Sequence, residues 1–424
     1  MNLILGFLEA RAWQHAQQLL MRLAPLEPAA SPVIGQALRS ELRRLLDTPA
    51  EVQPMEEGEA STDSELLAEP TFEVLCVLGL WIHKDIVLFT QLCRKLRGHL
   101  LAAGIPETGL ESSGATPLML EAIAQVEGAM EAAILPALTL LSANPAAVNE
   151  VYSVLGLLPY TARFRLYSTW KDAINGRNPM LAAQRQLTVQ EVRRIMRRLS
   201  KENVKEFGRK LGKVAHGDPL TVFSTILGQI EVYNNMIQPV VDAFKYLTSM
   251  GYDVLTYSVI VNLAQSNSSR NKLKEDGMNV SLWLQSLAAF CGHVTRKYPA
   301  FHLTALMQLL CNQLKNNQSI DLLVLKEVLA KMTGVEVLSD LSDDQVAAMA
   351  GGEQLRTEAL TFTMTGSAKS LQKGAARLKD ALMSKDDPMA VPFLVLIGQQ
   401  RTSILFNTDT PHLKLVRPDT RCPR

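Results

Sequence analysis

Apolar residues recur at helical spacing in nearly every stretch of this 424-residue chain between its polar, glycine or proline breaks. One such stripe, in the segment SIDLLVLKEVLAKMTG, consists of Ile320, Val324, Val328 and Met332. Ser319 is placed to cap the first turn of this helix, and Gly334 is placed to end it. No comparable run alternates apolar and polar residues, so we predict an all-α protein.

Helices of this length joined by short turns favour antiparallel pairs stacked side by side. In QPVVDAFKYLTSMG, for example, Pro239 fits the first turn of a helix that we expect Gly251 to end. No strict sequence period is visible, which argues against tetratricopeptide or ankyrin arrays. We therefore predict an irregular α-solenoid of stacked antiparallel helix pairs, with a compact globular bundle as the alternative.

The chain divides by composition into five parts. The segment TPAEVQPMEEGEASTDSELLAEP is acidic and contains prolines with little to bury, so we expect a flexible linker there. The predicted parts are an N-terminal helical segment (1–47), this acidic flexible linker (48–70), a helical region (71–145), a helical-repeat region (146–406) and an irregular tail (407–424).

Composition limits the function classes. The 43 basic and 42 acidic residues nearly cancel, so any nucleic-acid binding must come from local patches. The most apolar run, 74–89, is interrupted by His83, Lys84 and Asp85, and a membrane span needs about 20 apolar residues, so we expect no membrane partner. Five scattered cysteines with apolar neighbours indicate reduced core thiols in an intracellular protein; they are Cys76, Cys93, Cys291, Cys311 and Cys422.

A local basic patch does exist, and we call it the basic ridge. It comprises Arg193, Arg194, Arg197, Arg198, Lys201, Lys205, Arg209, Lys210 and Lys213. If the segment is one helix, Arg194, Arg198, Lys201 and Lys205 share a face; the alternative is that LSKENV breaks it into two helices. The ridge is interpreted equally as a docking surface for a partner or as a solvated face, with sequence-nonspecific RNA contact as a third interpretation.

A second cluster mixes aromatic and basic residues in LPYTARFRLYSTWK. Its aromatic residues are Tyr160, Phe164, Tyr167 and Trp170. Their rings could be taken for a platform on which nucleic-acid bases stack. Their spacing puts them on one helix face, which favours core packing. We expect Arg163, Arg165 and Lys171 on the outer side.

Motifs for catalysis are absent or weak. There is no phosphate-binding loop and no HExxH, and Ser269 to Lys272 fits the frequent Ser-x-x-Lys pattern only within a polar loop. The best metal candidates are Cys291, His293, His302 and Cys311. Their spacing over two helices favours packed thiols and surface imidazoles over zinc. We predict no enzyme activity, no catalytic or metal site and no cofactor.

Long collinear strings, nearly continuous from about 150 to 416, resemble the THO complex subunit 2 family. They include VYSVLGLLPYTARFRLYSTWK, RRIMRRLSKENVKEFGRKLGKVAHGDP, IQPVVDAFKYLTSMGYDVLTYSVI, WLQSLAAFCGHVTRKYP, LLVLKEVLAKMTGVE and QQRTSILFN. The resemblance implies a large α-helical nuclear scaffold without catalytic residues. It also implies that such a scaffold holds the other THO subunits and recruits a DEAD-box RNA helicase for mRNA processing, mRNP assembly and export.

Two departures from the family qualify what is carried over. The family's subunit is far longer, so this chain corresponds to an N-terminal portion. The ending RPDTRCPR does not look like the family, and from it we expect a truncated, alternatively spliced or mispredicted product. The preferred hypothesis is a non-enzymatic scaffold within THO, and the alternative is a helical protein that contacts RNA phosphates through the basic ridge.

Overall fold

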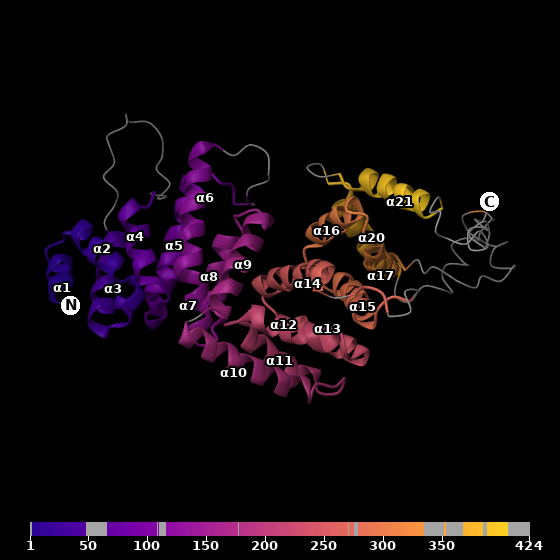
Figure 1. Cartoon of the computed structure of the whole chain (residues 1–424), viewed down its shortest axis with the longest axis horizontal. Helices are drawn as coiled ribbons and strands as arrows, with labels where there is room; N and C mark the ends of the chain where they lie inside the picture. Colours follow the sequence, from indigo (N-terminus) through magenta and orange to yellow (C-terminus); the bar gives the residue numbers. More distant parts are fainter. Residues whose placement is uncertain are drawn as a thin grey trace. The chain divides into compact units, whose positions relative to one another are not determined.

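The computed structural model describes residues 2–47, 66–107, 109, 116–176, 178–269, 271–274, 279–334, 352, 368–384 and 388–405. Over these ranges the chain forms α-helices, short 3-10 turns and one π-helical segment, and it contains no strand (Figure 1). Its β contacts there are two isolated bridges, Leu273–Val280 and Met383–Pro388. The predicted all-α helical-repeat fold is confirmed. Most of the expected acidic linker, and all of the expected tail, lie outside the described residues.

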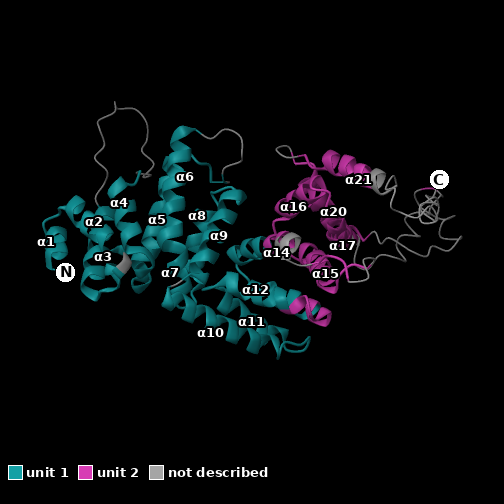
Figure 2. Ribbon diagram, in the orientation of Figure 1, with its two compact units in different colours: residues 1–228, 238–258 teal, residues 229–237, 259–424 magenta. Residues whose placement is uncertain are grey.

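The contacts divide the chain into two compact units (Figure 2). Unit 1 contains residues 1–228 and 238–258, and unit 2 contains residues 229–237 and 259–424. Among the described helices, none is both long and apolar enough to cross a membrane.

Unit 1 begins with helices that pack on their chain neighbours. They are α1 (Asn2–Glu9), α2 (Trp13–Arg22), α3 (Pro32–Asp47), α4 (Glu69–Leu78) and α5 (Ile86–Ala102), with the 3-10 turns η1 (Ala24–Leu26), η2 (Pro28–Ala30) and η3 (Gly79–Lys84). The α3 helix packs on α1, α4 and α5 through buried leucines such as Leu38 and Leu42. Asp85 fixes the start of α5, because its Oδ1 accepts a hydrogen bond from the Leu88 N–H at 3.1 Å.

The middle of unit 1 is one interrupted helix followed by two further helices. Its elements are α6 (Pro117–Ala129), the π-helical η4 (Met130–Ile134), α7 (Leu135–Leu140), α8 (Pro145–Leu155) and α9 (Tyr160–Asn175). The α8 helix packs on α5, and α9 packs on α7. Pro136 lies inside the continuous helix, has no N–H to donate and crowds the preceding turn, which explains the widened π segment before it. The side chains of Thr116 and Asn144 cap α6 and α8.

The last part of unit 1 carries the basic ridge. Its elements are α10 (Pro179–Met196), α11 (Val204–Ala215), α12 (Pro219–Ile230), α13 (Ile237–Ala243), η6 (Phe244–Tyr246) and the first half of α14 (Ser249–Ser269). The prediction that Gly251 ends a helix is wrong. The helix at Pro239 passes into η6, and Gly251 instead lies in the first turn of α14, where its N–H donates to Thr248 Oγ1 at 3.2 Å.

Unit 2 continues with helices that pack pairwise. They are α15 (Leu282–Lys297), α16 (Leu303–Lys315), α17 (Leu322–Thr333), α20 (Ala368–Leu382) and α21 (Ala390–Leu405), with η5 (Asn234–Met236) and η7 (Ser319–Asp321) as 3-10 turns. The α15 helix packs on α17, and α16 packs on α20 and α21. The predicted stripe is confirmed for Val324, Val328 and Met332, which are fully buried, whereas Ile320 is half-buried and lies in η7 before α17 begins. Gly334 ends α17 with φ 75°, whereas Ser319 begins η7 and does not cap α17.

Candidate functional site: the basic ridge

All nine side chains of the basic ridge are exposed to solvent. Between 191 and 213 the sequence holds nine basic and three acidic residues, a local net charge of +6 on a chain whose total is +1. The ridge therefore concentrates positive charge on one part of unit 1, carried by α10, the following turn and α11.

The end of α10 is oriented by its buried apolar face. Val192, Ile195 and Met196 are buried, so Arg193 and Arg194 on the same two turns point to solvent. Cations in the last turn of a helix also interact favourably with the partial negative charge at its C-terminus. Packing against α7, α9 and α11 holds α10 in place.

The turn between α10 and α11 is tied by one side chain, that of Asn203. Its Oδ1 accepts from the Ser200 N–H at 2.8 Å, and its Nδ2 donates to the Arg198 carbonyl at 2.7 Å. These bonds satisfy backbone groups left open where α10 ends. The predicted break at LSKENV is confirmed. The alternative, a single helix face from Arg194 to Lys205, is wrong.

The α11 helix presents its cations because its opposite face is made of small and apolar residues. Leu211 and Ala215 are buried, and Gly212 lies directly against Tyr246. A Cβ atom at Gly212 would lie 2.6 Å from the Tyr246 carbonyl oxygen, so only glycine allows this approach of α11 to η6. The side chains of Lys205, Arg209, Lys210 and Lys213 lie on the exposed side.

Few of the ridge cations are neutralised by neighbours. Arg194 pairs with Glu191 at 2.8 Å, and Lys210 pairs with Glu206 at 2.6 Å. The hydrogen bond from Lys210, and then its charge, lower the pKa of Glu206. Within the described part of the chain, no ion pair is seen for the other seven ridge residues. Such unpaired exposed cations are free to meet the anionic groups of a partner.

A hollow of about 440 Å³ lies beside the ridge, between α10 and the end of α11. Arg194, Lys210 and Lys213 contribute to its wall, together with Glu191 and Asp218. Asp218 is buried and caps α12, because its Oδ1 accepts from the Thr221 N–H at 3.0 Å. Its Oδ2 has no hydrogen-bond partner, and burial raises the pKa of this carboxyl group. Asp218 was not among the predicted site residues, although an Asp directly before Pro219 is a recognisable helix start.

The aromatic cluster of α9 belongs to the core, as predicted. Tyr167 and Trp170 are fully buried, and Phe164 packs on Tyr257 with ring centroids 5.7 Å apart. The expectation that Arg163 lies on the outer side is wrong, whereas Arg165 is exposed as predicted and Lys171 is half-buried.

Arg163 is buried because α14 supplies its counterion. Its Nε donates to Asp253 Oδ2 at 2.7 Å, and its Nη1 donates to the Leu158 carbonyl at 2.7 Å. The Tyr167 hydroxyl donates to the same carboxylate at 2.8 Å. Burial raises the pKa of Tyr167 well above its usual range, so the phenol keeps its proton. We call Arg163, Tyr167 and Asp253 the buried network.

Three of the four metal candidates have structural positions of their own, and the fourth, His293, is half-buried on α15. Cys291 and Cys311 are buried in α15 and α16, and burial raises the pKa of the Cys291 thiol to about 12. His302 caps α16, since its Nδ1 accepts from the Ala305 N–H at 3.2 Å. Among the described residues, no group of three or more His, Cys, Asp or Glu side chains converges as metal ligands would.

The Ser-x-x-Lys match also has a structural explanation. Lys272 is buried rather than in an open polar loop, and its Nζ lies 2.7 Å from Asp321 Oδ2. The side chain of Ser269 lies outside the described residues.

Two family models match adjoining parts of the chain. The model described as THO complex subunit 2 N-terminus matches residues 60–209, and the model described as transcription- and export-related complex subunit matches residues 211–288. The two matches meet within α11, so both include part of the basic ridge.

Curated relatives match nearly all of the chain or about half of it. A THO complex subunit 2 from Arabidopsis thaliana is 40% identical over 98% of this chain, and this alignment covers 24% of the relative. A THO complex subunit 2 from Homo sapiens is 36% identical over 98% of this chain, and this alignment covers 27% of the relative. A THO complex subunit 2 from Saccharomyces cerevisiae is 25% identical over 53% of this chain, and this alignment covers 14% of the relative. The chain thus spans about a quarter of the length of the first two.

Proposed function

Because the chain belongs to the THO complex subunit 2 family, matching it over 98% of its own length, we propose that it is a non-catalytic scaffold subunit of the THO complex. The single observation that carries this proposal is the 40% identity to a THO complex subunit 2 over nearly the entire chain. On this proposal the protein works in the nucleus, in mRNA processing and export. Its role is to hold other THO subunits and to bring a DEAD-box RNA helicase to the assembling mRNP.

The chemistry of the described residues supports a binding role. Several buried charged groups have structural roles: Arg163 and Asp253 pair with each other, Lys272 pairs with Asp321, and Asp218 caps a helix. None of these arrangements places a nucleophile beside a base in an open cleft, which is the geometry that covalent catalysis requires. Stacked helices with an exposed basic ridge are instead typical of a docking surface.

Within this scaffold, we assign the basic ridge to an acidic partner. The supporting observation is that seven of its nine cations lack an ion pair in the described structure. Exposed ion pairs contribute little to stability, but unsatisfied exposed charge steers the encounter with an oppositely charged surface. The partner on this proposal is an acidic surface of another THO subunit or of the helicase.

Co-purification tests the scaffold proposal. The tagged chain, expressed in cells and retrieved from nuclear extract at low salt, should bring down other THO subunits. A matched pair of variants tests the ridge: Arg197→Glu, Lys201→Glu and Lys205→Glu together, against Arg11→Glu, Arg22→Glu and Lys95→Glu as the control with the same charge change. Only the ridge variant should lose subunits. Recovery of no THO subunit by the unaltered chain would refute the scaffold proposal.

A second candidate function is direct RNA binding by the same ridge. Lys210 lies 4.8 Å from the Phe207 ring centroid, and Arg209 lies 5.8 Å from that of Tyr246, so cations and rings do occur together here. Phosphate contacts release counterions, so affinity for single-stranded RNA should fall steeply with salt. Removing three contacts should make the slope of log affinity against log salt shallower by about two. Unchanged RNA affinity in the ridge variant would exclude this candidate.

A further inference from the structure

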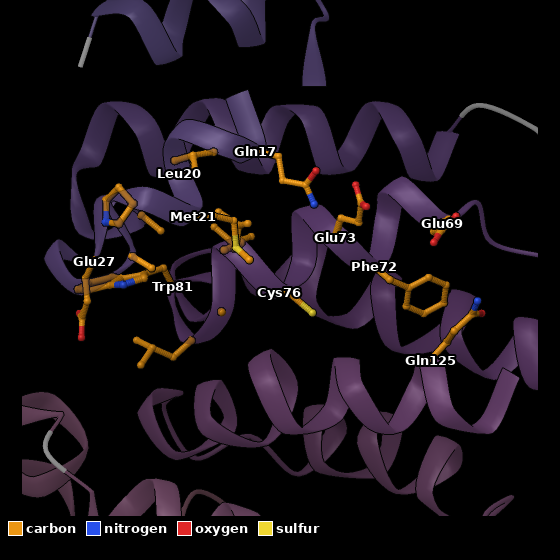
Figure 3. A pocket seen from close by; sticks show the side chains of 17 residues that line it. Gln17, Leu20, Met21, Glu27, Glu69, Phe72, Glu73, Cys76, Trp81 and Gln125 are labelled. Atoms are coloured by element: carbon orange, nitrogen blue, oxygen red, sulfur yellow. The ribbon is translucent and has the colours of Figure 1, made fainter. Parts of the chain in front are cut away.

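A second concave surface lies in the N-terminal part of unit 1, far along the sequence from the ridge. It is a groove of about 570 Å³ between α2, the turns η1 and η2, α4 and η3, with one side chain from α6 (Figure 3). We call it the N-terminal groove.

The wall of the N-terminal groove is mainly apolar. Of its lining residues, Leu20, Phe72 and Leu78 are buried, whereas Met21 is 64% exposed. Trp81 is half-buried, and Cys76 is the one exposed thiol among the cysteines that the structure describes. An exposed methionine is an adaptable contact surface of the kind that binding grooves use, and the Trp81 ring has Lys84 Nζ at 4.9 Å from its centroid.

The charged residues that line the N-terminal groove are acidic, and one basic residue outside the lining, Lys84, lies against the lining Trp81. Glu27, Glu69 and Glu73 line the groove, and none of the described lining side chains is basic. Glu73 accepts a hydrogen bond from Trp13 Nε1 at 2.6 Å, which fixes its carboxylate at the rim. Figure 3 shows Glu27 beside Trp81 at one end and Glu69 with Phe72 at the other, with Met21 and Cys76 between them. The groove is thus apolar in the middle and acidic at both ends.

The helical walls of the N-terminal groove favour a helical peptide over an extended one as the bound segment. An extended peptide needs main-chain partners, but the walls are helices whose backbone groups already bond within each helix. A helical peptide satisfies its own backbone and presents only side chains, so it fits a groove between helices. Its apolar side chains would cover Met21 and Trp81, and basic side chains at its ends would meet the three carboxylates.

We infer that the N-terminal groove docks an amphipathic helix of a partner protein, with an apolar centre and a Lys or Arg near each end. This inference rests on the proposed scaffold function and gives the chemistry of one partner. The groove and the basic ridge then select partners of opposite charge, so one scaffold can hold two different proteins without competition between them.

Fluorescence anisotropy on the full-length chain tests this inference directly. The probe is a labelled synthetic helical peptide with a Leu and Met stripe and Lys at both ends. A second peptide with Glu in place of Lys keeps the apolar face and reverses the charge. We expect the basic peptide to bind at least about tenfold more tightly than the acidic one. Equal binding of the two peptides, or no binding of either, would overturn the inference.

Two variants with the same charge change locate the binding site. Met21→Lys puts a cation in the centre of the groove, whereas Leu26→Lys alters a nearby leucine that is 77% exposed and does not line it. Both positions are exposed, so neither change should unfold the protein. Met21→Lys should weaken the basic peptide about tenfold or more, and Leu26→Lys should leave its affinity within about twofold. An unaffected Met21→Lys variant would place the peptide elsewhere.

Protection of Cys76 gives an independent readout. In a Cys422→Ser background, the bound basic peptide should slow maleimide labelling of Cys76.

The groove inference and the scaffold proposal can fail separately. If the peptide does not bind while the tagged chain still retrieves THO subunits, the groove inference alone is wrong. If the peptide binds but no subunit is retrieved, the scaffold proposal alone is wrong.

Discussion

Basic side chains have opposite roles in two regions of unit 1, the buried network and the basic ridge. In the buried network, Arg163 is 8% exposed and each of its charged hydrogen bonds has a fixed acceptor on Asp253 or Leu158. In the basic ridge, the cations are exposed and most form no ion pair in the described structure. A buried charge must be paired for the protein to fold, whereas an exposed charge can be kept for a partner.

This contrast distinguishes charges that stabilise the fold from charges that are available to bind a partner. Removing a charge that is paired within the chain should lower the free energy of unfolding. It should reduce partner binding only to the extent that the protein unfolds. Removing an exposed charge that has no ion pair should weaken partner binding and leave the free energy of unfolding nearly unchanged. The variants below test this separation, in order of their expected effect on the free energy of unfolding.

The largest effect is expected for Asp253→Ala. This change leaves the Arg163 guanidinium buried without its counterion and the Tyr167 hydroxyl without its acceptor. Removing one partner of a buried ion pair costs about 3–5 kcal/mol. The control is Arg165→Ala, which removes an exposed arginine paired with Glu127 and should cost less than about 1 kcal/mol. Urea unfolding measures both, and equal losses would contradict the contrast.

A smaller loss is expected for Gly212→Ala. The added Cβ would meet the Tyr246 backbone oxygen at 2.6 Å, so α11 must move away from η6 at a cost of about 1–3 kcal/mol. Gly228→Ala is the matched control, because a Cβ there meets nothing within 4 Å and alanine favours the helix by about 0.5–1 kcal/mol. Thermal unfolding should therefore shift in opposite directions. A shift in the same direction would argue against the close approach of α11 and η6.

A pH-dependent effect is expected at Asp218. Burial raises its pKa above the ordinary value of 3.8, so its contribution to stability is fully present below that value and is lost as pH rises through the raised pKa. Asp218→Asn keeps an acceptor for the Thr221 N–H and removes the titration, so unfolding free energy should become flatter against pH in this window. An unchanged pH profile would show that the Asp218 carboxylate is not desolvated.

The smallest effect on stability is expected for the ridge variant with Arg197→Glu, Lys201→Glu and Lys205→Glu. These side chains are exposed and unpaired in the described structure, so the free energy of unfolding should change by no more than about 0.5 kcal/mol. Partner or RNA binding should nevertheless fall by about tenfold or more. A large loss of stability with unchanged binding would assign the ridge to folding instead.

The helices were predictable from the sequence because apolar spacing records which face is buried. The stripe at Val324, Val328 and Met332 and the break at LSKENV both follow from local pattern. Arg163 was misplaced because its burial depends on Asp253, which lies 90 residues away on another helix. No local pattern reports such a pairing, although an acidic residue within the apolar run of α14 does mark Asp253 as unusual.

The candidate sites were predictable to different degrees. The basic ridge is contiguous in the sequence, so its charge was visible there, and its two ion pairs are local i,i+3 and i,i+4 pairs within α10 and within α11. The turn held by Asn203, which divides the ridge between these two helices, depends on hydrogen bonds that only the structure shows. The N-terminal groove was not predicted. Its carboxylates come from separate elements, at Glu27 and at Glu69 and Glu73, and only the packing of α2, η2 and α4 brings them to one rim.

Cross-linking mass spectrometry on a reconstituted THO complex containing this chain tests the central claim most directly. Lys201, Lys205 and Lys213 of the basic ridge should form cross-links to other subunits. Lys95, which is exposed on α5, provides the comparison within the same sample. Ridge lysines that link only within this chain, while Lys95 links to other subunits, would contradict the account.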